Sequence, residues 1–216
     1  YIHQFLQPLV EEWDRANSVS GNPGTGKQRR QADFFPSVLR PALERGEKLV
    51  VIISDALRFE AGAELRERLS SINKISAEIE AMTAALPTVT AVGMNALLPH
   101  ESLFLRADGT VELDGQQIAG IEGRSKYLDS YVTSRYPGKR AAAYWVNDIL
   151  SLSSAAAREL VSGIDLLYIY SNGIDAAADN AKTESSLPEA VESELSTLEG
   201  IVKKIANQLN RSNILI

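Results

Sequence analysis

The chain has 216 residues, of which 44% are hydrophobic and 23% charged, enough to bury the core of one large or two small globular domains. It contains no cysteine and two histidines, so disulfides, thiolate metal sites and histidine-rich zinc centres are excluded within these residues. No apolar run approaches the roughly 20 residues that cross a bilayer, and the first residues lack a signal-peptide pattern. We therefore expect a cytoplasmic protein without a membrane partner. The net charge of −6 does not favour nucleic acid as a general partner, although a local basic cleft is compatible with it.

The first 46 residues are predicted to form a helical N-terminal segment, followed by an α/β domain over residues 47–216. Apolar residues recur at helical spacing through residues 1–17. The next stretch, GNPGTGKQ at 21–28, satisfies most of the phosphate-binding loop pattern. That loop needs a preceding strand and a Ser or Thr after its lysine, whereas here a helix precedes it and Gln28 follows the lysine. We therefore interpret the stretch as a Gly/Pro linker and keep a nucleotide-dependent switch as an alternative.

Hydrophobic periodicity predicts alternating strands and helices through the rest of the chain. Strands are expected at 49–54, 75–85, 141–146, 165–170 and 213–216. Helices are expected at 31–45, 57–72, 91–98, 125–136, 153–162 and 187–209. Two Asp-Gly pairs, at 108–109 and 114–115, are hairpin signals and predict a small antiparallel insertion over residues 103–118. Strands that alternate with helices indicate an α/β fold with a mostly parallel sheet.

Polar side chains follow several of the predicted strands. Asp55 ends the aliphatic run LVVIIS, Thr90 follows the segment 75–85, and Asp175 and Asp179 follow the strand 165–170. The carboxyl ends of parallel strands share one edge of a sheet, where ligands bind. Carboxylates with a hydroxyl suit hard or borderline cations, and this combination predicts metal-assisted phosphoryl or sulfuryl transfer. An aspartate after a buried strand is equally common as a helix cap or a turn residue, so that interpretation stays open.

Three motifs, in order along the chain, resemble those of the PglZ domain family. They are IISDALRFE at 52–60, LPTVTAVGMNALLPH at 86–100 and YIYSNGIDAAADNAKTE at 168–184. This family is a branch of the alkaline phosphatase superfamily and occurs in bacterial phage-defence loci of the BREX type. The resemblance implies a three-layer α/β/α core and a site for two divalent metal ions. Zinc is the usual metal in this superfamily, and manganese or magnesium are the alternatives.

The resemblance also assigns roles to individual residues. Asp55 is similar to the metal ligand after the first strand, and Thr90 to the nucleophile that also binds metal, with Thr88 as the alternative nucleophile. Asp175 and Asp179 occupy positions that hold the other metal. Having Asp179 where a histidine might stand favours manganese or magnesium over zinc. Arg58 is a candidate for clamping a phosphate, although pairing with a neighbouring carboxylate is an equally ordinary role for it.

The chain departs from the family pattern at two points. Ser171 stands where the family places a histidine, and the sequence stops at Ile216, before an expected Asp-His-Gly metal motif. We therefore expect an incomplete fragment, inactive for lack of downstream ligands, of a metal-dependent phosphatase or phosphodiesterase of a phage-defence protein. Its implied partners are phosphate esters, including nucleic acid, and other defence proteins. The alternative is a non-catalytic scaffold or interaction module in a defence complex.

Overall fold

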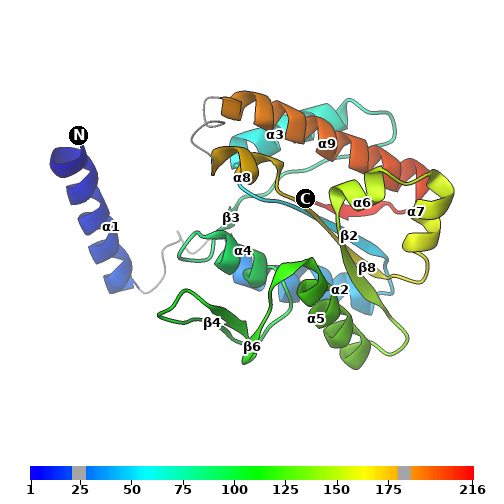
Figure 1. Ribbon diagram of the computed structural model, residues 1–216, viewed down its shortest axis with the longest axis horizontal. Coiled ribbons are helices and arrows are strands. Elements are labelled where there is room, and N and C mark those ends of the chain that lie inside the picture. Colours follow the sequence, from blue (N-terminus) through cyan, green and yellow to red (C-terminus); the bar gives the residue numbers. More distant parts are fainter. Residues whose placement is uncertain (21–27, 180–185) are drawn as a thin grey trace.

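A four-stranded parallel sheet forms the centre of the computed structural model, which describes residues 1–20, 28–179 and 186–216 (Figure 1). Its strands lie in the order β7, β8, β2, β9. Their bounds are Ala141–Trp145 for β7, Leu166–Ser171 for β8, Leu49–Ser54 for β2 and Asn213–Leu215 for β9. In the central pair β2 and β8 every residue except Ser54 is buried, as expected for strands covered on both faces.

Helices cover both faces of this sheet, which confirms the predicted three-layer α/β/α core (Figure 1). The helices α2, α4 and α5 lie on the face that includes Tyr168 and Tyr170, and α3, α6, α7 and α9 lie on the face that includes Val50 and Ile52. The short helix α8 follows β8 directly. Their bounds are Arg40–Glu44 (α2), Phe59–Ser70 (α3), Thr90–Ala96 (α4), Gly120–Arg135 (α5), Val146–Leu150 (α6), Ser154–Leu160 (α7), Gly173–Ala178 (α8) and Leu187–Gln208 (α9).

The N-terminal segment begins with the π-helical turn η1 (Ile2–Leu6), which continues as α1 (Gln7–Ser20). Its apolar residues up to Trp13 are exposed. Residues 21–27, which the sequence analysis interpreted as a Gly/Pro linker, lie outside the described residues. After it come η2 (Gln31–Asp33) and η3 (Phe35–Leu39), and buried residues of η3 and α2 pack into the core under β2. The proposed division of the chain at residue 46 stays a prediction. No helix among the described residues is long and apolar enough to span a bilayer.

The predicted strand at 75–85 was wrong in its length and in its place. The strand that forms there, β3, comprises only Met82–Thr83 and pairs with β1 (Arg29–Arg30) in a separate two-stranded sheet. A strand that joins a parallel sheet covered on both faces must bury side chains on both sides. This segment instead alternates apolar residues with the exposed Glu78 and Glu80, and even Ile79 is 39% exposed.

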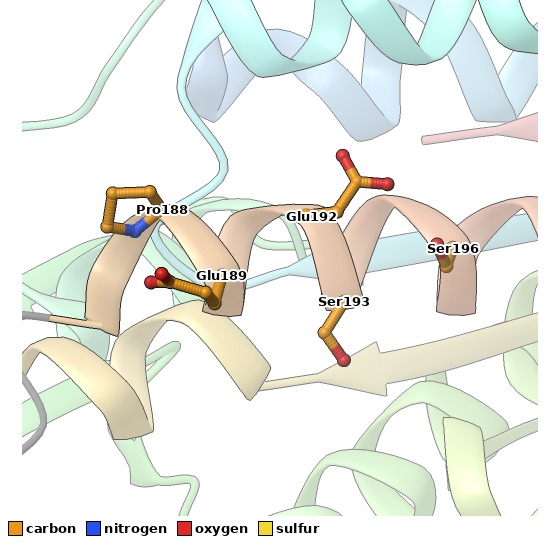
Figure 2. Close-up of a pocket in the computed structure, with 5 residues that line it drawn as sticks. All are labelled: Pro188, Glu189, Glu192, Ser193 and Ser196. Atoms are coloured by element: carbon orange, nitrogen blue, oxygen red, sulfur yellow. The ribbon is translucent and has the colours of Figure 1, made fainter.

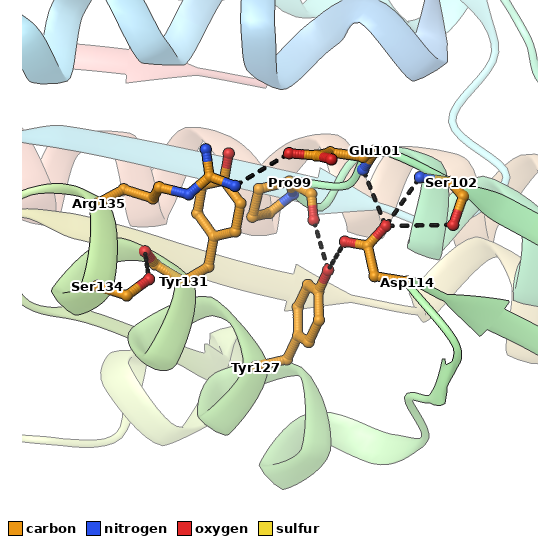
Figure 3. Close-up of polar contacts among 8 residues, drawn as sticks. All are labelled: Pro99, Glu101, Ser102, Asp114, Tyr127, Tyr131, Ser134 and Arg135. Atoms are coloured by element: carbon orange, nitrogen blue, oxygen red, sulfur yellow. Dashed lines mark hydrogen bonds and ion pairs between the residues drawn. The ribbon is translucent and has the colours of Figure 1, made fainter.

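The predicted insertion is confirmed as a three-stranded antiparallel sheet of β4 (Leu103–Leu105), β5 (Val111–Leu113) and β6 (Gln116–Gln117). Figure 3 shows how it is attached to α5. Asp114 accepts hydrogen bonds from the backbone amides of Glu101 and Ser102 and from the Tyr127 hydroxyl, which also lies 2.9 Å from the Pro99 carbonyl. The insertion is therefore anchored to the helix that begins just after it.

Candidate functional site

The tip of β2 turns sharply at its carboxyl end and presents Asp55. The Asp55 amide donates to the Ser171 carbonyl at 2.9 Å, which extends the β2–β8 ladder by one bond. Ala56 then adopts a φ of +63°, a left-handed conformation that non-glycine residues rarely take and that is common where a functional site constrains the backbone. The turn leaves the Asp55 side chain partly buried at the sheet edge, with α3 beginning four residues later.

Three of the predicted site residues come together at this edge. Burial raises the pKa of Asp55, and the negative charge of Asp175 raises it further, while a hydrogen-bonding interaction with the Thr90 side chain lowers it. Burial also raises the pKa of Asp175, and the charge of Asp179 adds to that effect. Electrostatically, Asp55, Thr90 and Asp175 therefore form one group, contributed by the end of β2, the first residue of α4 and the first turn of α8.

The other predicted residues lie at the margin of this group. Thr88 is exposed two residues before α4. Arg58 is exposed at the N-cap of α3. Asp179 is exposed at the C-cap of α8 and influences the group through Asp175. Of the two threonines, Thr90 is the one whose side chain interacts with Asp55.

Sequence reasoning missed a cation in this site, Arg124. It is partly buried near the start of α5, and its positive charge lowers the pKa of Asp55. Its guanidinium carbon lies 5.1 Å from the centre of the Tyr170 ring. Among the described residues, neither its buried Nε atom nor the buried Tyr170 hydroxyl has a hydrogen-bond partner. The predicted helix at 125–136 began five residues too late, which left Arg124 in an apparent loop.

A buried carboxylate on the opposite face of the sheet was missed as well. Glu194 of α9 is 3% exposed, and its two oxygens accept hydrogen bonds from Ser54 at 2.6 Å and from Ser171 at 2.9 Å. Ser54 immediately precedes Asp55, and Ser171 stands four residues before Asp175. Glu194 therefore ties together the two strand ends that carry the site. A signal existed in the sequence, since Glu194 falls within the apolar stripe of α9.

Two pockets lie near α9. One, of about 580 Å³, is lined by Trp145, Ser171, Asn172 and Glu194 among others, and lies where β7 and β8 end. The other, of about 440 Å³, is open and lies on the first turns of α9, lined by the residues drawn in Figure 2: Pro188, Glu189, Glu192, Ser193 and Ser196. Its Glu192 points toward α3, where it pairs with Arg68 at 2.6 Å. We place the candidate site at the strand ends, where the charged residues interact.

The residues of the site are chemically suited to a divalent cation. Burial is the main cause of the raised pKa values of Asp55 and Asp175, and repulsion adds to it, from Asp175 on Asp55 and from Asp179 on Asp175; a nearby cation would relieve that repulsion. Oxygen donors of this kind suit hard or borderline metals. Within the part of the chain that the structure describes, however, no three carboxylate or histidine side chains lie close enough together to hold a metal ion.

The chain is similar to known proteins of one family. Residues 34–216 match the family described as the BREX system PglZ alkaline phosphatase-like domain. The whole chain is 30% identical to the alkaline phosphatase-like protein BrxZ of Escherichia coli O9:H4 (strain HS), and 33% identical to the alkaline phosphatase-like protein PglZ of Bacillus cereus (strain H3081.97). It spans 25% of the length of each. The chain therefore belongs to the PglZ family of alkaline phosphatase-like domains of BREX systems.

Proposed function

We propose that this domain carries part of the active site of a metal-dependent phosphoryl-transfer hydrolase, of the phosphatase or phosphodiesterase type, in a phage-defence protein. The observation that supports this most is the interaction of the Thr90 side chain with Asp55 beside Asp175. A hydroxyl held against a carboxylate at the carboxyl edge of a parallel sheet is a suitable arrangement for an activated nucleophile.

In this proposal Thr90 is the nucleophile. Its hydroxyl oxygen forms a bond to phosphorus while the bond from phosphorus to the leaving oxygen breaks, and the hydroxyl proton is lost to solvent. Water then hydrolyses the phosphothreonine and regenerates the hydroxyl.

Asp55, Asp175, Asp179 and the Thr90 oxygen are the proposed metal ligands. When bound, two divalent ions, zinc with manganese or magnesium as alternatives, would stabilise developing negative charge and lower the pKa of the attacking hydroxyl. Other defence-system proteins are the proposed partners of the whole protein, because the matching family is described as a domain of BREX systems.

A second candidate function is that of a non-catalytic scaffold that holds partners in a defence complex. It is favoured by the spacing of the carboxylates, since no three potential ligands in the described segments converge closely enough to hold a metal.

The two functions separate in one assay. The full chain encoded by the gene is incubated with p-nitrophenyl phosphate or bis-p-nitrophenyl phosphate and Zn²⁺, Mn²⁺ or Mg²⁺. We expect metal-dependent turnover that falls about 1,000-fold or more in Thr90→Ala and much less in Thr88→Ala, because only the nucleophile is indispensable. Turnover that survives Thr90→Ala would contradict the assignment of the nucleophile, and no turnover with any of the metals would favour the scaffold.

A further inference from the structure

Glu194 holds the two strand ends of the candidate site from the α9 side of the sheet. Ser54 and Ser171 are paired neighbours in the β2–β8 ladder, and the hydroxyls of both donate to this one carboxylate, at 2.6 and 2.9 Å. Asp55, the residue after Ser54, instead interacts with Thr90 of α4, which covers the other face. The carboxylate is therefore adjacent to Asp55 along the chain, although the two side chains lie on opposite sides of the sheet.

Glu194 also lies against the first residue of α8, Gly173. A Cβ atom at Gly173 would come within 2.5 Å of the Glu194 Oε2 atom, so the carboxylate directly contacts the backbone there. Asp175 is two residues further along, in the first turn of the same helix. One buried side chain thus contacts the chain within two residues of both Asp55 and Asp175.

The packing of α9 does not by itself require a carboxylate at this position. Apart from Glu194 and Lys204, the buried residues of this helix are leucine, isoleucine and valine. Burying a carboxylate is unfavourable, and replacing a buried polar network by apolar residues of similar volume is often neutral or stabilising. A hydrogen-bonded network differs from apolar packing in that it fixes the distances and directions of the groups it joins.

We propose that Glu194 is a positioning residue, which sets the spacing of Asp55 and Asp175 through its contacts with Ser54, Ser171 and the start of α8, and thereby the affinity of the site for a divalent cation. This inference rests on the proposed function for the assignment of the two aspartates as cation ligands. It adds that their geometry is controlled from the opposite face of the sheet, by a residue that does not touch the cation.

Binding of Mn²⁺ to the full chain encoded by the gene, measured by isothermal titration calorimetry, tests this role without turnover. We expect Glu194→Leu to raise the Kd for Mn²⁺ about 10- to 100-fold, the usual cost of losing a residue that orients metal ligands. Glu194→Gln should raise it much less, because its amide oxygen and NH₂ group can still bond to two hydroxyls. An equal Kd in wild type and Glu194→Leu would overturn the proposal, as would a wild-type protein that binds no Mn²⁺ at millimolar concentrations.

Lys204→Met is the matched control, because Lys204 is a second buried charged residue of α9. It is 9% exposed, and its Nζ atom donates to the carbonyls of Leu150 and Leu152, far along the helix from the strand ends. Its loss should lower Tm by about 2–8 °C and leave the Kd for Mn²⁺ unchanged. If Lys204→Met raises the Kd as much as Glu194→Leu does, the effect is a general loosening of α9 and Glu194 has no positioning role.

A variant without the polar network separates positioning from stability. In the triple variant Ser54→Ala, Ser171→Ala, Glu194→Leu no polar group of the network is left unpaired, so we expect a Tm at least equal to that of Glu194→Leu. The Kd for Mn²⁺ should nevertheless stay at least about 10-fold above the wild-type value, because the strand ends are no longer tied to α9 by hydrogen bonds. A wild-type Kd in this variant would show that packing alone is sufficient, which contradicts the proposal.

The same variants distinguish this inference from the proposed function. Turnover of p-nitrophenyl phosphate that depends on Mn²⁺, together with a Kd for Mn²⁺ that is independent of Glu194, would keep the hydrolase and overturn the positioning role. Binding of Mn²⁺ that depends on Glu194, in a protein without turnover, would keep the positioning role and remove the proposed catalysis.

Discussion

Gly173 lies against the buried carboxylate of Glu194, and replacing it by alanine tests how firmly that carboxylate is held. A Cβ atom at Gly173 would come within 2.5 Å of the Glu194 Oε2 atom, which is the oxygen that accepts the hydrogen bond from Ser171. Its backbone does not have a positive φ, so alanine is compatible with the local conformation. The steric clash with Glu194 is therefore the main effect that should make alanine unfavourable at position 173.

Two effects of opposite sign decide the outcome. Helix propensity favours alanine over glycine by up to about 1 kcal/mol. Against this, moving the carboxylate breaks or weakens a hydrogen bond to a charged acceptor, which contributes about 1.5–3 kcal/mol. We expect Gly173→Ala to lower the free energy of unfolding by about 1–2 kcal/mol in net terms and Tm by about 2–8 °C.

Urea denaturation of Gly173→Ala, Glu194→Ala and the double variant measures this coupling. Once Glu194 is shortened, the alanine at 173 has no clash, so we expect it to be neutral or stabilising in that background. Gly200→Ala is the control, because Gly200 is also in a helix and a Cβ there would meet no atom within 4 Å. It should stabilise the protein by about 0.5–1 kcal/mol. If Gly173→Ala stabilises the protein as much as Gly200→Ala does, the rigid carboxylate described here is wrong.

Three further predictions concern the site and its supports. Asp55→Asn should stabilise the protein at neutral pH. Because the pKa of Asp55 is raised in the folded protein, its contribution to stability is present at low pH and is lost as the pH rises through that pKa. The difference in Tm between variant and wild type should therefore widen with rising pH and be absent well below that pKa. Ala56→Gly should raise the free energy of unfolding by about 1 kcal/mol in urea denaturation, because glycine adopts a positive φ without strain; an equal or lower value would show that the turn is not strained. Tyr127→Phe removes the hydroxyl shared between Pro99 and Asp114, and hydrogen exchange should become faster in the insertion but not in β8.

The sequence was sufficient for those parts of the fold in which one local signal dominates. The aliphatic run of β2 and the apolar stretch of β8 could only be buried strands, and the Asp-Gly pairs placed the insertion correctly. The segment at 75–85 misled because alternation alone does not reveal whether both faces will be covered. Its glutamates are solvated, and only two residues pair.

Sequence reasoning could predict the site residues that come shortly after strands of the central sheet, but not those that α5 and α9 contribute. Asp55 and Asp175 follow directly from the order of the strands, whereas Thr90 was placed by a predicted strand at 75–85 that does not join the central sheet. The structure nevertheless brings the three side chains together. Arg124 and Glu194 come from α5 and α9, and their relevance depends on how those helices rotate and pack against the sheet. A charged residue inside an apolar stripe, as Glu194 is, marks such a position, but its partners at Ser54 and Ser171 are far away in the sequence.

The contacts of Glu194 also bear on the order in which the protein folds. Ser54 and Glu194 are 140 residues apart, so their hydrogen bond closes one of the longest loops in the chain, and contacts of this kind form late. Until α9 packs against the sheet, the ends of β2 and β8 are held together by the sheet alone, while the carboxylates beside them repel one another. The site is thus expected to be among the last regions to reach its native arrangement during folding, and among the first to lose it when α9 detaches.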